Sequence, residues 1–549
     1  MNDATHEPRR RWRPASLPAA WAALVVACLS MTPSLLPRPG VYQGVVTGIT
    51  SVIAYGLGVL VVRLVRELAE RDARAPRPLW WRLFGVVAVV ALVGSALVGL
   101  RWQNEMSDLV GVAGPGLGWW ALLPVAALLF AAFLGLGRVL AVGYRAIARL
   151  LSRVMGRRAS HAIGLVTVAA ATWFVVSGLL LSTAVRVTDE AFSIRNDVTP
   201  DGVVQPTTEL RSGGADSLVD WGTLGREGRV FAAGGPSAEQ ITDFTGTDAL
   251  EPIRTYAGLD SADDVQDRAR LAVDDLDRAG GFDRGYLLVA TTTGSGWVES
   301  SAVDSLEYIA GGDTAIVAMQ YSYLPSWISY LVDQERAREA GRALFDAVYE
   351  RWLELPVADR PQLLVFGESL GSFGAESAFS GAQDLANRTD GALLVGPPGF
   401  NPLFSDFSAA RDAGSPAVEP VLRDGQIVRF TTRVTERVEP VGAPWDGTRV
   451  LYLLHPSDPI IWWSPDLLFG RPDWLDEPRG DGVLDAMVWM PVVTFWQVTA
   501  DLPRGMAVPP GTGHAYAGEH VDGWVAVLQP DGWTDAKTAE LRAIVLGGR

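Results

Sequence analysis

A serine between two glycines marks the stretch QLLVFGESLGSFGAESAF, residues 362–379, in which an apolar run gives way to small residues. Ser369 is the centre of the only Gly-x-Ser-x-Gly pattern in the chain. Glycines on both sides leave room for the tight strand-to-helix turn that raises a serine hydroxyl above a parallel sheet. The pattern therefore favours a nucleophile, although a plain glycine-rich turn between a strand and a helix has the same letters.

A serine hydroxyl needs a base at neutral pH, and histidine is the usual one. Of the five histidines, His6 and His161 belong to the amino-terminal tail and to an apolar segment, which leaves His455, His514 and His520. In hydrolases with this kind of turn the order along the chain is Ser, then Asp or Glu, then His. We favour His514, in PPGTGHAYAGEH, as the base; His520 is the alternative, and His455 precedes the acid.

The carboxylate that orients the base is expected between the serine and the histidine. Asp458 lies in HPSDP, just beyond the apolar run RVLYLL, and completes the order Ser369, Asp458, His514. Asp466 in WWSPD is the alternative acid. Chance is less able to produce a serine, an acid and a histidine in the required order than to produce any one of them in a suitable place. The sequence therefore predicts a catalytic triad.

An acyl-transfer site also needs N–H donors for the negative charge that develops on the substrate oxygen. One is expected from Leu370, directly after the nucleophile, and the other from the loop TTTGSGW that follows GYLLVA. Thr293 is our candidate in this loop, with Thr292 and Gly294 as alternatives. Such a site requires neither a cofactor nor a metal, and a single cysteine, Cys28, excludes a cysteine-based metal site.

The elements that must position these residues are short apolar runs that alternate with helix-like stretches such as LVDQERAREAGRALFDAVYERWLEL. Continuous apolar runs of this length are typical of strands buried on both faces. The alternation predicts a doubly wound α/β domain with a mostly parallel sheet. The expected strands lie at 285–293, 314–322, 361–367, 392–398 and 449–459.

The first third of the chain carries five apolar segments, each long enough to cross a bilayer as a helix. They lie at about 15–36, 41–62, 83–100, 119–142 and 162–185. Arginines cluster before the first segment, between the second and third, and between the fourth and fifth. By the positive-inside rule these parts are cytoplasmic, and five crossings of the cytoplasmic membrane would place everything after residue 185 on the outside.

Charge divides the chain in the same way. Residues 1–185 hold 18 basic and 7 acidic residues, whereas residues 186–549 hold 28 basic and 55 acidic ones. An acidic second part argues against nucleic-acid binding, which needs clustered positive charge. We therefore predict a transmembrane domain at 1–185, a connector packed on the catalytic domain at 186–249, and an α/β-hydrolase domain at 250–549.

Several longer strings carry a family resemblance. The chain resembles the bacterial alpha/beta-hydrolase family that has an amino-terminal membrane domain, the alpha/beta-hydrolase 9 group. The strings that carry the resemblance are SMTPSLLPRP, SLVDWGTLGREGRVF, GESLGSFG, HPSDPIIWWSPDLL and GTGHAY. The resemblance extends over nearly the whole chain. It implies a serine-hydrolase fold with Ser369 as nucleophile, Asp458 as acid and His514 as base.

These observations predict a membrane-anchored serine esterase that acts on a lipid or cell-envelope ester. An acidic domain would suit a cationic aminoacyl lipid electrostatically. The aromatic stretches YSYLPSWISYL, at 321–331, and IIWWSPDLLFGRPDWL, at 460–475, are candidates for an acyl pocket or a lid. The alternative is a hydrolase fold that serves only as a binding or envelope-interaction module. A transporter is disfavoured because the apolar segments carry no acidic or basic residue at their centres.

Overall fold

The protein is described from a computed structural model at residues 16–70, 76–175, 193, 195–324, 328–330, 334–432, 444–445 and 447–547. The chain divides into two compact units. The first comprises Met1–Ala170, Asp466–Arg471 and Leu484–Asp501. The second comprises Ala171–Pro465, Pro472–Val483 and Leu502–Arg549.

Apolar helices dominate the first unit. They are α1 (Leu17–Leu29), α2 (Gly40–Leu68), α3 (Pro78–Val110), the 3-10 turn η1 (Gly116–Ala121), α4 (Leu122–Leu151), α5 (Arg157–Trp173) and α18 (Val493–Asp501). In the described part of the chain, α2, α3 and the continuous stretch Gly116–Leu151 are long and apolar enough to cross a membrane. The first predicted segment forms only the 13-residue α1, and the fifth, at 162–185, extends beyond the described residues.

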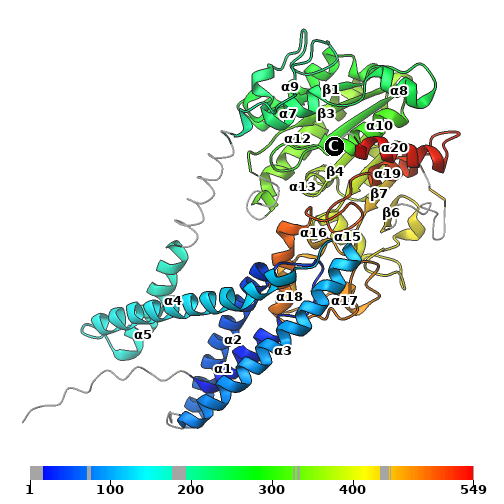
Figure 1. Cartoon of the computed structure of the whole chain (residues 1–549). Coiled ribbons are helices and arrows are strands. Elements are labelled where there is room, and N and C mark those ends of the chain that lie inside the picture. The colour runs from blue at the N-terminus through cyan, green and yellow to red at the C-terminus, as the bar shows by residue number, and fades with distance from the viewer. Residues whose placement is uncertain are drawn as a thin grey trace, which may run out of the picture. The chain divides into compact units, whose positions relative to one another are not determined.

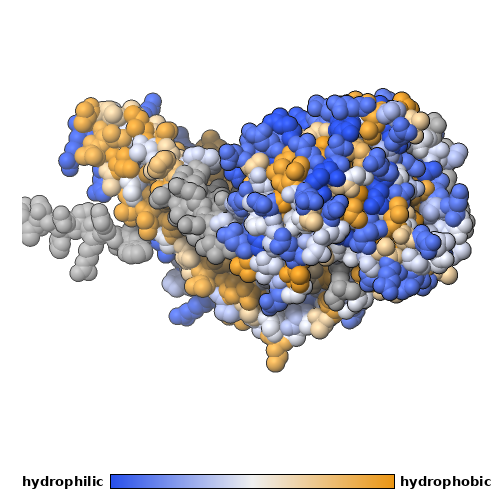
Figure 2. Space-filling view, turned by 90° about the horizontal axis from the view of Figure 1, so that it is seen from above, coloured by the Kyte–Doolittle hydropathy of each residue, from blue (hydrophilic) through white to orange (hydrophobic). Residues whose placement is uncertain are grey.

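The long helices are apolar on every side, and many of their large side chains face outward. Val86, Val89 and Val90 of α3 expose 64–68% of their surface. Figure 2 shows hydrophobic side chains gathered over the helices of the first unit, whereas hydrophilic side chains predominate over the second unit. A helix that presents valine and leucine all round is suited to lipid.

A buried polar cluster joins the end of α18 to the segment between α1 and α2. Arg38 and Asp501 are both fully buried, and Arg38 Nη1 lies 3.7 Å from Asp501 Oδ1. Asp501 Oδ2 also accepts hydrogen bonds from the Leu35 and Leu36 N–H groups at 3.2 and 3.4 Å. Although α18 comes more than 400 residues later in the chain, it is thus part of the first unit.

The second unit is built on a seven-stranded sheet with the order β1-β3-β2-β4-β5-β7-β6, in which every pair is parallel. The predicted α/β-hydrolase architecture is confirmed. The strands are β1 (Ile253–Ala257), β2 (Tyr286–Thr291), β3 (Thr314–Met319), β4 (Gln362–Glu368), β5 (Gly391–Val395), β6 (Val428–Thr431) and β7 (Arg449–Leu453). Neither β1 nor β6 was among the strands expected from the sequence.

Helices cover both faces of this sheet (Figure 1). One layer contains α9 (Val265–Arg278), α12 (Gln334–Glu354) and α13 (Leu370–Glu376). The other contains α7 (Gly225–Ala233), α8 (Ala238–Thr245), α10 (Ser300–Ile309), α19 (Glu519–Leu528) and α20 (Asp535–Gly547). Shorter helices, α14 (Ala382–Arg388), α15 (Pro402–Ala409), α16 (Pro459–Trp462) and α17 (Asp473–Asp476), lie in the connections.

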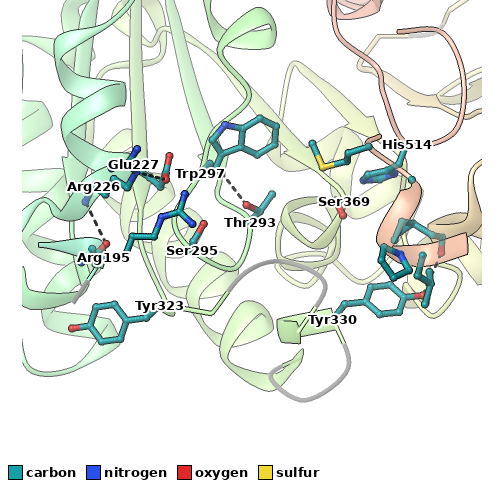
Figure 3. A pocket seen from close by; sticks show the side chains of 16 residues that line it. Arg195, Arg226, Glu227, Thr293, Ser295, Trp297, Tyr323, Tyr330, Ser369 and His514 are labelled. Atoms are coloured by element: carbon teal, nitrogen blue, oxygen red, sulfur yellow. Dashed lines mark hydrogen bonds and ion pairs between the residues drawn. The ribbon is translucent and has the colours of Figure 1, made fainter. Parts of the chain in front are cut away.

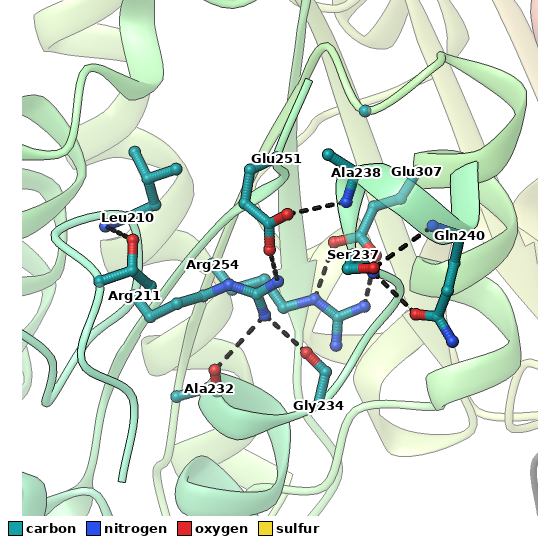
Figure 4. A network of polar contacts seen from close by, with 12 residues as sticks. Leu210, Arg211, Ala232, Gly234, Ser237, Ala238, Gln240, Glu251, Arg254 and Glu307 are labelled. Atoms are coloured by element: carbon teal, nitrogen blue, oxygen red, sulfur yellow. Dashed lines mark hydrogen bonds and ion pairs between the residues drawn. The ribbon is translucent and has the colours of Figure 1, made fainter. Parts of the chain in front are cut away.

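Two arginines hold the segment before β1 against the sheet (Figure 4). Arg254 of β1 is buried and donates to both carboxylate oxygens of Glu307 at 2.6 and 2.7 Å. Arg211 donates to Gly234 O at 2.6 Å and lies 3.5 Å from Glu251. Paired charges and bonded carbonyls satisfy buried guanidinium groups, so this part of the predicted connector is built into the second unit.

Candidate active site

The turn after β4 holds Ser369 in a backbone conformation that L-residues rarely adopt. Its φ is 55° and its ψ is −126°. The Ser369 N–H donates to Val395 O at 2.9 Å, and the Ser369 carbonyl accepts from Ser372 N and Ser372 Oγ at 3.0 and 2.7 Å. A strained residue fixed on both sides is typical of a nucleophile at the end of a strand.

The two glycines of the pattern are required by packing. A Cβ at Gly367 would lie 2.5 Å from Gly371 O and 2.7 Å from Ser372 Cα. A Cβ at Gly371 would collide with the carbonyl oxygen of Thr291, at the end of the neighbouring strand β2. The spacing therefore reflects the close approach of α13 to β2 and β4 and is not a chance run of small residues.

An acid and a base meet at the same edge of the sheet. His514 Nδ1 lies 2.7 Å from Asp458 Oδ2, and both side chains are buried. Asp458 follows β7, whereas His514 lies in the loop before α19. The structure thus brings together the acid and the base expected from the sequence, which are 56 residues apart.

Asp458 is fixed by two further donors. Its Oδ1 accepts the Ile460 N–H at 2.8 Å, which caps α16, and its Oδ2 accepts the Tyr516 hydroxyl at 2.8 Å. A buried carboxylate that accepts hydrogen bonds from several donors is held in one orientation. Tyr516 was not singled out from the sequence, because a tyrosine two residues after a histidine has no distinctive pattern.

The imidazole of His514 lies next to the strand end that also holds Ser369. A Cβ at Gly396 would be only 2.6 Å from His514 Cε1, and the preceding residue, Val395, accepts the Ser369 N–H. His514 Nε2 is buried and has no hydrogen-bond partner among the described residues. Ser369 and His514 line one cavity of about 350 Å³ (Figure 3).

The charge of His514 is set by opposing effects. Burial lowers the pKa of the imidazole, but the Asp458 carboxylate, its hydrogen bond and the more distant Glu368 carboxylate outweigh burial. The pKa of His514 is therefore raised above the usual value for histidine. A base of this strength is suited to take a proton from a serine hydroxyl.

The two expected oxyanion donors lie in different settings. Leu370 is the first residue of α13, so its N–H has no acceptor within the helix and lies directly after the nucleophile. Thr293 lines the cavity, but its N–H donates to Trp297 O at 3.0 Å. The alternative Gly294 makes no N–H hydrogen bond to any described residue, and Thr292 directs its hydroxyl to Met319 O.

The remaining candidates occupy supporting positions. His455 Nδ1 lies 2.8 Å from Gly513 O, and its ring stacks on Tyr516 with centroids 4.0 Å apart, so it braces the loop that carries His514. His520, the alternative base, is fully buried with Nε2 2.8 Å from Glu368 Oε2. The alternative acid Asp466 belongs to the first compact unit.

The rest of the cavity includes polar residues that sequence reasoning missed. Its polar wall is lined by Arg195, Asn196, Arg226 and Glu227, together with Ser295, Trp297 and Tyr323. Its apolar part is lined by Tyr330, Ile460, Leu502, Pro503 and Met506. Parts of the predicted lid, 325–327 and 331, lie outside the described residues. Within the described chain, no group of three or more His, Cys, Asp or Glu side chains is placed to hold a metal ion.

Comparison with known proteins gives two matches. The sequence profile of the alpha/beta-hydrolase family matches residues 253–541, which is more than half of the chain. The profile of that family's N-terminus matches residues 31–236. No curated protein and no solved structure matches the chain significantly.

Proposed function

The chain belongs to the alpha/beta-hydrolase family, and we propose that it is a membrane-anchored serine esterase that cleaves an ester of a lipid or cell-envelope component. One observation carries this proposal: a strained serine and a histidine that is paired with an aspartate line a single cavity at the carboxyl edge of the sheet. Ligand sites in open parallel sheets lie at this edge.

In the proposed reaction, Ser369 Oγ attacks the ester carbonyl carbon while His514 Nε2 takes the hydroxyl proton. His514 then returns that proton to the leaving alcohol as the C–O bond breaks. A water molecule attacks the acyl carbon of the resulting acyl-enzyme and gives a proton to the same nitrogen. The bond between the acyl carbon and Ser369 Oγ then breaks, His514 returns the proton to Oγ, and the acid is released. Asp458 keeps Nδ1 protonated, so that Nε2 faces the nucleophile as an acceptor.

The oxyanion of the tetrahedral intermediate would be held by the Leu370 N–H and a second donor from the loop after β2. We keep Thr293 as the candidate for this second donor, through its hydroxyl or through an N–H released from Trp297 O when substrate binds. Loss of one such donor typically costs about 3 kcal/mol in the barrier.

The proposed anchoring rests on the three long apolar helices, which suit a bilayer and would hold the site near lipid substrates. We further propose that the hydrolase unit lies outside the cytoplasmic membrane, as the distribution of arginines indicates.

Labelling of the detergent-solubilised full chain with a fluorophosphonate probe tests the nucleophile. We expect labelling of the wild type, none of Ser369→Ala, and unchanged labelling of Ser380→Ala, a matched control at an exposed serine. Hydrolysis of 4-nitrophenyl butyrate should follow the same pattern. If the wild type is not labelled, the chain is better described as a non-catalytic binding module of this fold. Equal labelling of Ser369→Ala would mean that the probe reacts at another residue, and it would remove Ser369 as the nucleophile.

A further inference from the structure

We propose that the esterase cavity contains a second binding element, in which Arg195, Asn196 and Arg226 hold an anionic oxygen group of the substrate, a phosphodiester or a carboxylate. We call Arg195, Asn196, Arg226 and Glu227 the arginine subsite. The inference rests on the proposed function, because it names the class of ester that the cavity takes.

The arginine subsite and the triad lie in different parts of one cavity. Figure 3 shows Arg195, Arg226 and Glu227 at one side, Ser369 and His514 at the other, and Thr293, Ser295 and Trp297 between them. All of these residues belong to the second compact unit. A single substrate can therefore place its ester carbonyl at Ser369 and a polar group at the arginines.

The charge of the arginine subsite is positive. Arg226 Nε lies 3.8 Å from Glu227 Oε1, which is a long contact between side chains that expose 29% and 22% of their surface. Arg195 forms no ion pair with any described residue. Figure 3 shows Arg195 and Arg226 beside Glu227, and all three residues line the cavity. Burial raises the pKa of Glu227, and the positive charges of Arg226 and Arg195 act in the opposite direction. Two cations therefore share one carboxylate, in a unit whose overall charge is strongly negative.

Asn196 adds an unused donor. Its side chain is 5% exposed, and its Oδ1 accepts hydrogen bonds from the Arg226 N–H at 3.3 Å and from Gln320 Nε2 at 3.1 Å. These two donors fix the orientation of the amide. The remaining Nδ2 group is buried at the cavity wall and has no hydrogen-bond partner in the described part of the chain. A buried donor without a partner is costly, and an anionic oxygen would satisfy it.

The backbone that follows Arg195 is tied to α7 by hydrogen bonds. Arg229 of α7 donates to Asp197 O and to Thr199 Oγ1, both at 2.8 Å, and so ties the segment after Arg195 to the helix that carries Arg226. Gly225 begins α7 with a φ of +70°, and a Cβ there would lie 2.6 Å from Asn196 Oδ1. The Asn196 amide is thus fixed before any ligand binds, and guanidinium groups provide paired N–H donors that match the planar oxygens of carboxylates and phosphates.

The acidic composition of the unit would suit a cationic substrate group. The arginine subsite favours an anionic group instead. A cation would meet one carboxylate against two guanidinium groups and an amide N–H donor, whereas an anion meets three donors and one competing carboxylate. Local charge within a cavity outweighs distant surface charge, because surface charges are screened over about 10 Å at ordinary ionic strength.

Direct binding to the full-length Ser369→Ala protein tests the inference without turnover. The probes are dibutyryl phosphatidylglycerol, the hemisuccinate of dibutyrylglycerol, and neutral dibutyrylglycerol, with affinities measured by calorimetry below the micellar concentration. We expect at least one anionic probe to bind about tenfold or more tightly than the neutral probe, as suits a charged hydrogen bond. Dimethyl phosphate and acetate are then added as competitors of the anionic probe. Displacement of the probe means that the subsite binds an isolated anion, and no displacement means that the anion binds only as part of the lipid.

Variants in the Ser369→Ala background assign the effect to residues. Arg195→Gln and Arg226→Gln should each reduce the preference for the anionic probe by about tenfold. Glu227→Gln should increase it, because the competing negative charge is removed. Arg270→Gln, at an exposed arginine of α9, should leave it unchanged. Equal binding of all three lipid probes, or an anionic preference that survives both arginine substitutions, would overturn the inference.

The two proposals fail in different ways. Absence of fluorophosphonate labelling at Ser369 removes the esterase but leaves the binding assay intact. Conversely, labelling together with equal binding of neutral and anionic probes removes the arginine subsite and leaves the esterase.

Discussion

At the scale of residues, the environment of His514 links charge to rate. The imidazole faces the buried carboxylate of Asp458 on one side and the cavity on the other. The carboxylate stabilises the imidazolium and raises the pKa of His514, and it also holds the tautomer that accepts a proton at Nε2. In the proposed mechanism, the same contact would therefore set both the orientation of the base and the pH at which the base becomes active.

The pH dependence of kcat/KM should report this contact. The general base must be neutral, so activity toward 4-nitrophenyl butyrate should fall as pH decreases through the raised pKa of His514. Asp458→Asn removes the stabilising charge, so we expect the acidic limb to move to lower pH and the rate to fall by about 10⁴-fold. Asp466→Asn is the matched control. If Asp458→Asn kept the wild-type pH profile of kcat/KM, Asp458 would not be the acid of the triad. If Asp466→Asn lost a comparable amount of activity, Asp466 would be the better candidate.

A second carboxylate, Glu376 of α13, affects stability. It is fully buried, and it accepts hydrogen bonds from Asn401 Nδ2, the Tyr452 hydroxyl and two N–H groups at the start of α15, at 3.0–3.2 Å. Burial raises its pKa to about 7, although these donors act in the opposite direction. The unfolded chain, with an ordinary pKa, releases this proton at lower pH than the folded chain does.

Stability should therefore fall as pH rises through the window between about 4.5 and 7. Glu376→Gln removes this titrating group. The difference in the free energy of unfolding between Glu376→Gln and wild type should therefore shift in favour of the variant, by on the order of 3 kcal/mol, when the pH is raised from 4.5 to 8. Chemical denaturation at several pH values measures this difference. Glu354→Gln, at an exposed position on α12, should show no such trend. A pH-independent difference for Glu376→Gln would show that the carboxyl is not protonated in the folded state.

The candidate site was predictable where its residues follow local rules. The two glycines around Ser369 are needed because α13 approaches β2 and β4 closely, and Asp458 follows β7, whose end lies at the same edge of the sheet as the end of β4. His514 follows no strand and lies in the loop before α19, so only its place after Asp458 in the chain order pointed to it. Asn196 and Tyr516 could not be found in this way. Asn196 contacts Gln320, 124 residues later, and no spacing in the sequence signals such a contact.

At the scale of elements, the two strands missed from the sequence both carry an arginine. Arg254 interrupts the apolar run of β1, and Arg429 interrupts that of β6. Arg254 is tolerated because Glu307 of α10 pairs with it in the interior, and Arg429 lies 3.8 Å from the centre of the Trp445 ring. Hydrophobic pattern alone cannot detect a strand whose buried charge is satisfied by a residue far along the chain.

The pairing of α18 with the segment after α1 also depends on a buried charge. Asp501→Asn keeps the shape of the side chain but leaves the guanidinium of Arg38 without its counterion, so we expect the free energy of unfolding to fall by about 3–5 kcal/mol. Arg38→Met combined with Asp501→Asn should lose less than Asp501→Asn alone. Denaturation in detergent measures both.

The same unit provides a control. Arg101 and Glu105 form an exposed pair on α3, with 81% and 39% of their side-chain surface accessible. Glu105→Gln should cost less than about 1 kcal/mol. An equally small effect of Asp501→Asn would mean that Arg38 is not held by this charge.

At the scale of the whole molecule, the long helices and the arginines agree on an alternating arrangement. Residues 69–77, between α2 and α3, hold three arginines, and five lie in Arg145–Arg158, which comprises the facing ends of α4 and α5 and the short connection between them. Residues 111–115, between α3 and η1, carry no charge. Three successive apolar helices with positive charge at alternate ends are expected to cross a membrane in alternating directions. The side on which the hydrolase unit lies then depends on the crossing at 162–185, part of which is outside the described residues.

Reporter fusions decide this point. Alkaline phosphatase, which is active only outside the cytoplasm, should be active when fused after Gly114 and after Arg549 and silent after Met155, where the arginine-rich connection lies. A fluorescent protein that matures only in the cytoplasm should give the reverse pattern at the same three positions and so controls for expression. If the fusion after Arg549 behaves like the fusion after Met155, the hydrolase unit faces the cytoplasm, and its ester substrate must be sought on that side of the membrane.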